Sequence, residues 1–304
     1  MLFRFAPYLV FGASVAVASV VPPFRSSLIG NYDLGLFLYL AISSLVVLGI
    51  IMAGWASNSK YSLFGAMRAA AQIVSYEIPL GLAVLVVVLA TGTLNPQRVV
   101  YDQAGGVHHW LIFRQPFLFI SAFLYYISAI AEVNRTPFDL PEAESEIVAG
   151  FHTEYSGIRF AYFFMAEYTN MVIVSAIATT LFLGGWSGPI PGWDLLPGVV
   201  WFALKTVLLV FVMMWLRWTL PRVRVDQLMA LCWKYFLPIG LVNVLGTGIL
   251  ELLAQEGVGL TIGGWRIGPN GIAWVVVPVL VALLGVYAFS GGPQPRPAAA
   301  PRRP

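Results

Sequence analysis

The sequence has 304 residues, of which 59% are hydrophobic and 10% are charged. Soluble domains carry about 25% charged residues, so a chain this poor in charge cannot cover its surface in water and is expected to lie in a membrane. The single cysteine, Cys232, excludes a disulfide framework and multi-cysteine zinc or iron–sulfur sites. The excess of 17 Lys and Arg over 14 Asp and Glu is too small to indicate nucleic-acid binding, and no metal site is expected.

Eight stretches of the chain are apolar for about 20 residues, the length that a helix needs to cross a membrane. Their predicted bounds are 5–21, 34–54, 72–90, 110–130, 160–182, 196–216, 235–253 and 272–289. We therefore predict an all-α polytopic membrane protein with about eight transmembrane helices in one integral membrane domain, residues 1–290. The tail, residues 291–304, is rich in Pro, Ala and Arg and is expected to be disordered.

The orientation is predicted from the basic residues, because cytoplasmic loops are enriched in Lys and Arg. With the N-terminus in the cytoplasm and alternating spans, 12 basic residues fall on the cytoplasmic side and 4 on the outer side. Both termini and the tail are therefore expected to be cytoplasmic.

The acidic residues gather in one predicted cytoplasmic loop. Six of the 14 follow the fourth span: Glu132, Asp139, Glu142, Glu144, Glu146 and Glu154. A capped surface helix explains part of this pattern, because Asp139 can cap a helix and Glu142 can complete a capping box. It does not explain Glu132 at the end of an apolar span, nor Glu142 and Glu146 at a spacing where like charges repel by about 0.2–0.5 kcal/mol.

Two further glutamates, Glu77 and Glu167, lie within predicted spans. An ionised carboxylate in hydrocarbon is costly, so such a group faces a wet interior, accepts a proton or joins helices by hydrogen bonds. Grouped carboxylates cannot all ionise and can therefore hold and pass protons, which makes a proton path the functional hypothesis. Lys205, in the middle of a span, is a candidate counter-charge for them or a snorkelling side chain.

Basic and polar segments are less specific. Arg217, Arg222 and Arg224 follow the sixth span, where composition alone favours positive-inside anchoring over a binding role. Arg135, within the acidic loop, is expected to hold one or more of the loop carboxylates. His152, beside Glu154, is able to titrate near neutral pH unless it is only structural.

The most specific stretch is the acidic loop, residues 131–146, with the sequence AEVNRTPFDLPEAESE. It resembles the signature of the membrane-subunit family that includes the H subunit of bacterial NADH-quinone oxidoreductase (respiratory complex I) and mitochondrial NADH dehydrogenase subunit 1. Further segments continue the resemblance up to about residue 285, at residues 54–61, 75–77, 150–157, 165–168 and 221–228.

The resemblance implies a subunit without its own redox centre in a bacterial inner (plasma) membrane. In this family the subunit walls the quinone chamber, joins the peripheral arm to the membrane arm and begins the proton path. Carried over, the proton path would comprise Glu132, Glu142, Glu144, Glu146, Glu154 and Glu167, with Glu77 further along. Arg135, Asp139, Arg217, Arg222 and Arg224 would shape the chamber and the junction. No catalytic residue, metal or cofactor is expected in the chain itself.

The implied partners are the quinone-site subunits of the peripheral arm, the small membrane-arm subunits, quinone and the lipid bilayer. NADH, FMN and iron–sulfur clusters would lie on partner subunits. Compared with the family's usual pattern, the chain starts at what corresponds to the second span, so the usual first transmembrane helix is missing. Two other functions remain open: the homologous membrane component of a membrane-bound hydrogenase or related complex, and an independent proton-coupled transporter.

Overall fold

A computed structural model describes residues 1–25, 31–139, 150–189, 197–257, 260–262 and 265–290. Nearly all regular structure in these residues is helical. The longer helices are α1 (Leu2–Ala18), α2 (Gly35–Ala56), α3 (Lys60–Thr91), α6 (Pro116–Glu132), α8 (Ile158–Phe182), α9 (Gly198–Thr219), α11 (Leu237–Gln255) and α12 (Pro269–Ser290). The short elements are α4 (Pro96–Asp102), η1 (Val107–His109), α5 (Leu111–Arg114), η2 (Gly150–His152), α10 (Val225–Ala230) and a π-helical segment, η3 (Leu231–Phe236).

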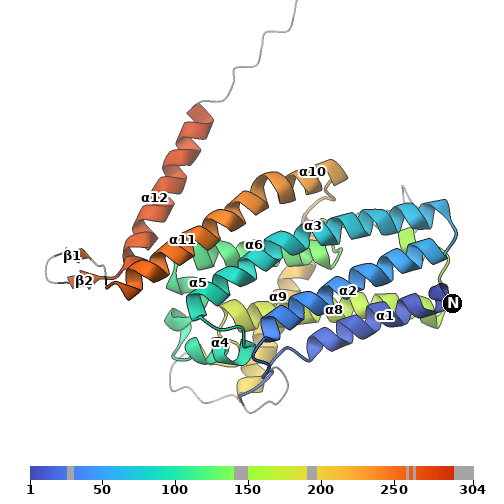
Figure 1. Ribbon diagram of the computed structural model, residues 1–304, viewed down its shortest axis with the longest axis horizontal. Helices are drawn as coiled ribbons and strands as arrows, with labels where there is room; N and C mark the ends of the chain where they lie inside the picture. Colours follow the sequence, from blue (N-terminus) through green and yellow to red (C-terminus); the bar gives the residue numbers. More distant parts are fainter. Residues whose placement is uncertain (26–30, 140–149, 190–196, 258–259, 263–264, 291–304) are drawn as a thin grey trace, which may run out of the picture.

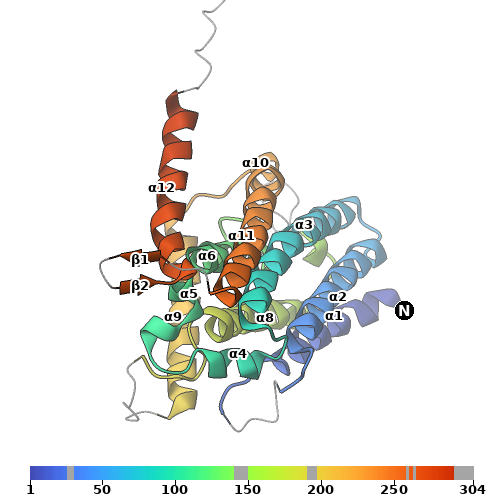
Figure 2. The ribbon, with the colours of Figure 1, turned by 60° about the vertical axis from the view of Figure 1, so that its left-hand side comes forward.

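The long helices form a bundle. Helix α1 packs against α2 and α8, α2 packs against α3, and α3 packs against α6 and α11 (Figure 1). Small residues permit the closest approaches: a Cβ on Gly49 would lie 2.4 Å from Val10 Cγ2, and one on Gly54 would lie 2.2 Å from Ala66 Cβ. Helix α12 contacts α11 and α6 near its start and then leaves the bundle, as both ribbon views show (Figures 1 and 2).

Each predicted span coincides with one of these longer helices, and the protein is an all-α polytopic membrane protein. Five helical segments are long and apolar enough to cross a membrane: α2, α3, α8, α9 and the continuous run Val225–Gln255. Three further apolar helices are shorter over the described residues: Leu2–Ala18, Pro116–Glu132 and Pro269–Val279.

The helices differ from the predicted spans in two places. The span predicted over residues 110–130 is broken at Gln115, whose φ of −145° and ψ of 147° are extended. Pro116 follows Gln115, and the residue before a proline is disfavoured in the α conformation, so α5 ends there and α6 starts afresh. Helix α3 starts at Lys60 and not near residue 72, because residues 60–71 continue as helix beyond the apolar window.

A short hairpin of β1 (Leu260–Ile262) and β2 (Trp265–Ile267) adds strands that the sequence did not predict.

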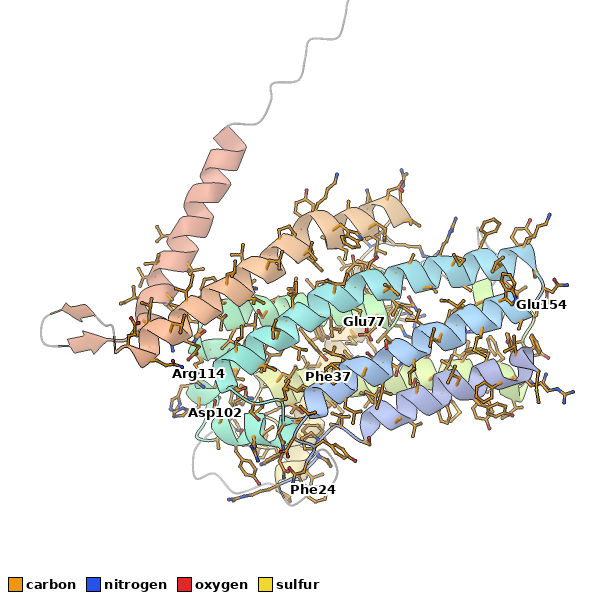
Figure 3. All side chains as sticks on the ribbon, viewed as in Figure 1. Phe24, Phe37, Glu77, Asp102, Arg114 and Glu154 are labelled. Atoms are coloured by element: carbon orange, nitrogen blue, oxygen red, sulfur yellow. The ribbon has the colours of Figure 1, made fainter. Side chains whose placement is uncertain are left out.

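The two ends of the bundle are chemically different. Glu154 lies at the end that carries the N-terminus, and Asp102 and Arg114 lie at the opposite end (Figure 3). Arg114 Nη1 lies 2.7 Å from Asp102 Oδ2, so this opposite end carries an ion pair at its surface.

Candidate functional site

Three of the ionisable side chains discussed above line one cavity inside the bundle. Glu132 at the end of α6, Glu167 on α8 and His152 on η2 surround a cavity of about 40 Å³. Apolar residues of α1, α2, α3 and α8 complete its wall: Val10, Val46, Ile50, Ile73, Phe163 and Ala166. These three ionisable residues, up to 35 positions apart in the sequence, therefore meet at one cavity whose wall is otherwise largely apolar.

A second cavity of about 20 Å³ adjoins the first and shares Glu132, Val133 and Asn170 with it. Its other polar lining comes from Tyr39 and Ser43. A water molecule needs roughly 10–15 Å³ of such space, so each cavity has room for at least one.

Unpaired polar atoms point to water in these cavities. Glu132 Oε2 and Asn134 Oδ1 are buried and have no hydrogen-bond partner within the described residues. Buried polar atoms are nearly always hydrogen-bonded in proteins, either to other groups or to ordered water. The cavities therefore combine the space and the chemistry that ordered water requires.

The turn after α6 gives Glu132 and Arg135 their positions. Asn134 adopts a left-handed conformation with φ of 54°, which Asn tolerates better than most residues and which ends the helix. Gln72 of α3 then fixes the turn, because its Nε2 donates hydrogen bonds of 2.8 Å to both the Ala131 and the Phe138 carbonyls.

Arg135 faces the acidic side chain of α8. Its Nη2 lies 3.4 Å from Glu167 Oε2, and the two side chains are 11% and 15% exposed. Its guanidinium also lies 4.4 Å from the centre of the Tyr168 ring, within the range of a cation–π interaction. The carboxylate that faces Arg135 among the described residues thus belongs to a neighbouring helix, whereas the sequence suggested carboxylates of the acidic loop.

Glu77 and a tyrosine pair extend the polar region. Glu77 lies midway along α3 (Figure 3), close enough to Glu132 for their charges to interact. Tyr39, which lines the second cavity, places its hydroxyl 3.3 Å from that of Tyr125 on α6. Tyr39, Tyr125 and Gln72 were not identified from the sequence, although a glutamine in an apolar span was a usable signal.

His152 is buried among aromatic rings and does not titrate near neutral pH. It contacts Phe151, Phe160, Phe163 and Phe164. Burial disfavours the charged imidazolium and lowers the pKa of His152 to about 4. The neutral form is therefore favoured at pH 7, which agrees with the structural interpretation of this residue.

The predicted junction residues occupy the surface beside the acidic loop. Arg222 Nη2 lies 3.1 Å from Asp139 Oδ2, and the Val223 amide donates to the Pro137 carbonyl at 3.0 Å. These contacts join the segment after α9 to the loop after α6. Arg217 and Arg224 are exposed.

The other predicted residues are placed as follows. Glu154 is exposed at the end of the bundle, and Glu142, Glu144 and Glu146 lie outside the described residues. Lys205 is buried, but its Nζ donates to the carbonyls of Leu183, Gly185 and Ser187 at 2.6, 3.0 and 2.7 Å. An ammonium has three N–H donors, and these three carbonyls accept from all of them. The described hydrogen bonds of Lys205 are therefore with carbonyls, whereas the sequence suggested that it pairs with carboxylates.

Comparison with known proteins identifies the family of this chain. Residues 1–248 match the family described as NADH dehydrogenase. The chain belongs to this family. The H subunit of NADH-quinone oxidoreductase from Anaeromyxobacter dehalogenans is 46% identical over 276 residues, which cover 84% of this chain and 67% of that protein.

Other members of the NADH dehydrogenase family are equally similar. The H subunit of the same enzyme from Geobacillus sp. is 49% identical over 83% of this chain and 74% of its own length. An H subunit from Geobacter sulfurreducens is 50% identical over 80% of this chain and 70% of its own length. These matches favour a membrane subunit of NADH-quinone oxidoreductase over a component of a hydrogenase or an independent transporter. Among the described residues, no group of three His, Cys, Asp or Glu side chains is arranged to hold a metal ion.

Proposed function

We propose that the chain forms the wall of the quinone chamber and the first part of the proton path in a proton-translocating NADH:quinone oxidoreductase. The observation that carries this proposal is the pair of cavities lined by Glu132, Glu167, Tyr39 and Asn170. The unpaired Glu132 carboxylate can exchange a proton with water in such a space, and the unpaired Asn134 amide oxygen can accept a hydrogen bond from that water. A purely structural seam between helices would require neither the space nor the unpaired oxygens.

The order of the groups suggests how a proton would move. Arg135 forms an ion pair with Glu167, which lines the first cavity. Glu132 is the ionisable residue that lines both cavities, so it would pass a proton from water in one to water in the other. A proton taken up at the first cavity would pass through Glu132 to the second cavity and toward Glu77.

The acidic loop and the basic segment complete the proposed site. Asp139, bound to Arg222, would hold the loop against the segment after α9, and Arg135 would face the chamber. Arg217 and Arg224 would contact the peripheral arm, because they are exposed beside this junction. Glu142, Glu144, Glu146 and Glu154 would supply protons at the chamber.

Location and partners follow from the same proposal. The chain would cross the bacterial inner membrane several times, with both termini and the Glu154 end in the cytoplasm. The peripheral-arm quinone-site subunits would dock there and carry FMN, the iron–sulfur clusters and the NADH site, while small membrane-arm subunits would pack beside the bundle. The basic residues favour this orientation by 12 to 4.

The test uses membranes that carry the whole complex with Glu132→Gln or Glu167→Gln. Glutamine keeps the size and hydrogen bonding of the side chain but cannot exchange a proton, so NADH-driven quinone reduction and proton pumping should fall together. Glu256→Gln is the matched control, because Glu256 is exposed at the far end of α11. NADH oxidation by an artificial acceptor measures complex content, and parental quinone reduction and pumping in both variants would contradict the proposal.

A further inference from the structure

Helices α6 and α11 meet along a row of polar side chains that the proposed proton path does not use. Asn243, Thr247 and Glu251 are spaced four residues apart on α11, so they share one face and cover about 12 Å. Ser121 of α6 and Gln115, directly before α6, lie opposite them. These five residues are called the α6–α11 seam.

Two hydrogen bonds define the pairing across the seam. Asn243 Nδ2 donates to Ser121 Oγ at 3.2 Å, and Gln115 Nε2 donates to Glu251 Oε1 at 2.6 Å. The helices are therefore antiparallel here, with Glu251 and Gln115 toward the end of the bundle where Figure 3 shows Arg114. Glu251 is only partly buried, whereas Gln115 and Thr247 are fully buried.

Hydrogen bonding between helices does not account for all of these groups. Gln115 Oε1 and Thr247 Oγ1 are buried and have no hydrogen-bond partner among the described residues. If the seam served only to join two helices, these oxygens would make it weaker than an apolar seam, because unpaired buried polar atoms are unfavourable. Water between the helices would satisfy them, and Glu251 stands at the exposed end of the row.

At its inner end, the seam approaches the polar groups around Glu132. Ser121 lies one helical turn from Tyr125, whose hydroxyl is 3.3 Å from that of Tyr39. Tyr39 lines the second cavity together with Glu132. Ser128, one turn further along α6, is fully buried, and its Oγ also has no partner among the described residues. Polar groups thus follow α6 from Glu132 to the opposite end of the bundle.

We propose that the α6–α11 seam is a water-filled half-channel through which protons leave this subunit on the outer side. Glu251 releases a proton to the outer water and regains one from water in the seam. The seam water in turn receives its protons from the pair of Tyr39 and Tyr125. This inference rests on the proposed function, because the protons come from the cavities around Glu132. It adds a route across this subunit, with Glu251 as the group that exchanges protons at the outer mouth.

The experiment measures protons delivered into inverted membrane vesicles per NADH oxidised, in the whole complex. Glu251→Gln and Thr247→Val should both lower this ratio, while quinone reduction in the presence of an uncoupler stays at the parental rate. Glu251→Asp should retain most of the ratio, since it keeps the ionisable group. Reduction of an artificial acceptor normalises every variant to complex content.

Two matched controls separate the half-channel from general damage to the bundle. Thr180→Val removes a fully buried hydroxyl that is bonded to the Ala176 carbonyl within α8, and Glu256→Gln removes an exposed charge. Neither should change the ratio. If either Glu251→Gln or Thr247→Val left the number of protons per NADH unchanged, the half-channel would be overturned. This holds even if Glu132→Gln lowers quinone reduction and proton pumping, a result that supports the proposed function alone. A lowered ratio in both seam variants with a parental Glu132→Gln would support a seam supplied from elsewhere and contradict the supply from Glu132.

Discussion

The pair of Arg135 and Glu167 permits a quantitative prediction for the double variant Arg135→Ala/Glu167→Gln. At the 3.4 Å that separates their charged atoms, an effective dielectric constant near 20 gives a gross attraction of about 5 kcal/mol. Removing two mostly buried groups from water offsets much of this attraction. We therefore expect a net coupling of about 2 kcal/mol between the two side chains, defined as the non-additive part of a double-mutant cycle.

Each single variant should differ from the pair. Arg135→Ala leaves a largely buried carboxylate without its guanidinium and also removes the contact with the Tyr168 ring, so it should destabilise the complex by about 3 kcal/mol. Adding Glu167→Gln should then recover about 2 kcal/mol of stability, because it removes the carboxylate charge. Quinone reduction should not recover, since the protonatable group is gone.

The assay is the half-life of the assembled complex on heating, measured as the fraction of complex that stays intact, because Glu167→Gln itself lowers quinone reduction. With a coupling of about 2 kcal/mol, the half-life of the double variant should differ roughly 30-fold from the half-life expected if the two single effects were additive. The control cycle uses Arg98 and Asp33, whose charged atoms are 3.6 Å apart but whose side chains are 68% and 82% exposed. Additivity of the Arg135 and Glu167 variants within about 0.5 kcal/mol would refute the reasoning.

Three other predictions test the frame around the site. Gln72→Leu should destabilise the complex by about 2 kcal/mol, because it removes the side-chain donor of the Phe138 carbonyl and leaves the Ala131 carbonyl with the Asn134 amide; thermal inactivation measures this, and a parental half-life would contradict it. Burial lowers the pKa of His152 to about 4, whereas a histidine in the unfolded chain titrates near 6.5. Between these two pH values the unfolded chain binds a proton at His152 and the folded chain does not. The stability of the folded chain therefore falls as the pH falls from 6.5 to 4. His152→Gln should remove that part of the acid sensitivity, on the order of 3 kcal/mol across the window, and equal acid sensitivity in parent and variant would refute it. Reporters fused after Arg224 or Pro304 should be cytoplasmic and one fused at Asp194 external; an external acidic loop would overturn the proposed orientation.

Composition and periodicity were sufficient for the helices but not for all their limits. Apolar windows located each long helix, because lipid and backbone hydrogen bonding leave a transmembrane segment few alternatives. The break at Gln115 was missed, although Pro116 marked it, because the apolar window continues across both residues. The start of α3 at Lys60 was missed because residues 60–71 are less apolar than a membrane span requires.

The candidate site could be predicted as a set of residue types but not as an arrangement. Glu132 and Glu167 stood out because a carboxylate in an apolar stretch is unfavourable without a partner. Their meeting at one cavity depends on how α6 packs against α8, which local sequence does not reveal. Lys205 shows the same limit, since its carbonyl partners belong to the turn after α8 and carry no signal in their side chains.

The position of Lys205 also has a consequence for biogenesis. Its ammonium is bound to carbonyls 18 to 22 residues earlier in the chain and lies 4.4 Å from the centre of the Trp110 ring. Helix α9 emerges from the ribosome only after these acceptors have been synthesised. The charge that would oppose insertion of α9 alone is therefore solvated by carbonyls of the preceding segment, so α8 and α9 are suited to enter the bilayer as one helical hairpin.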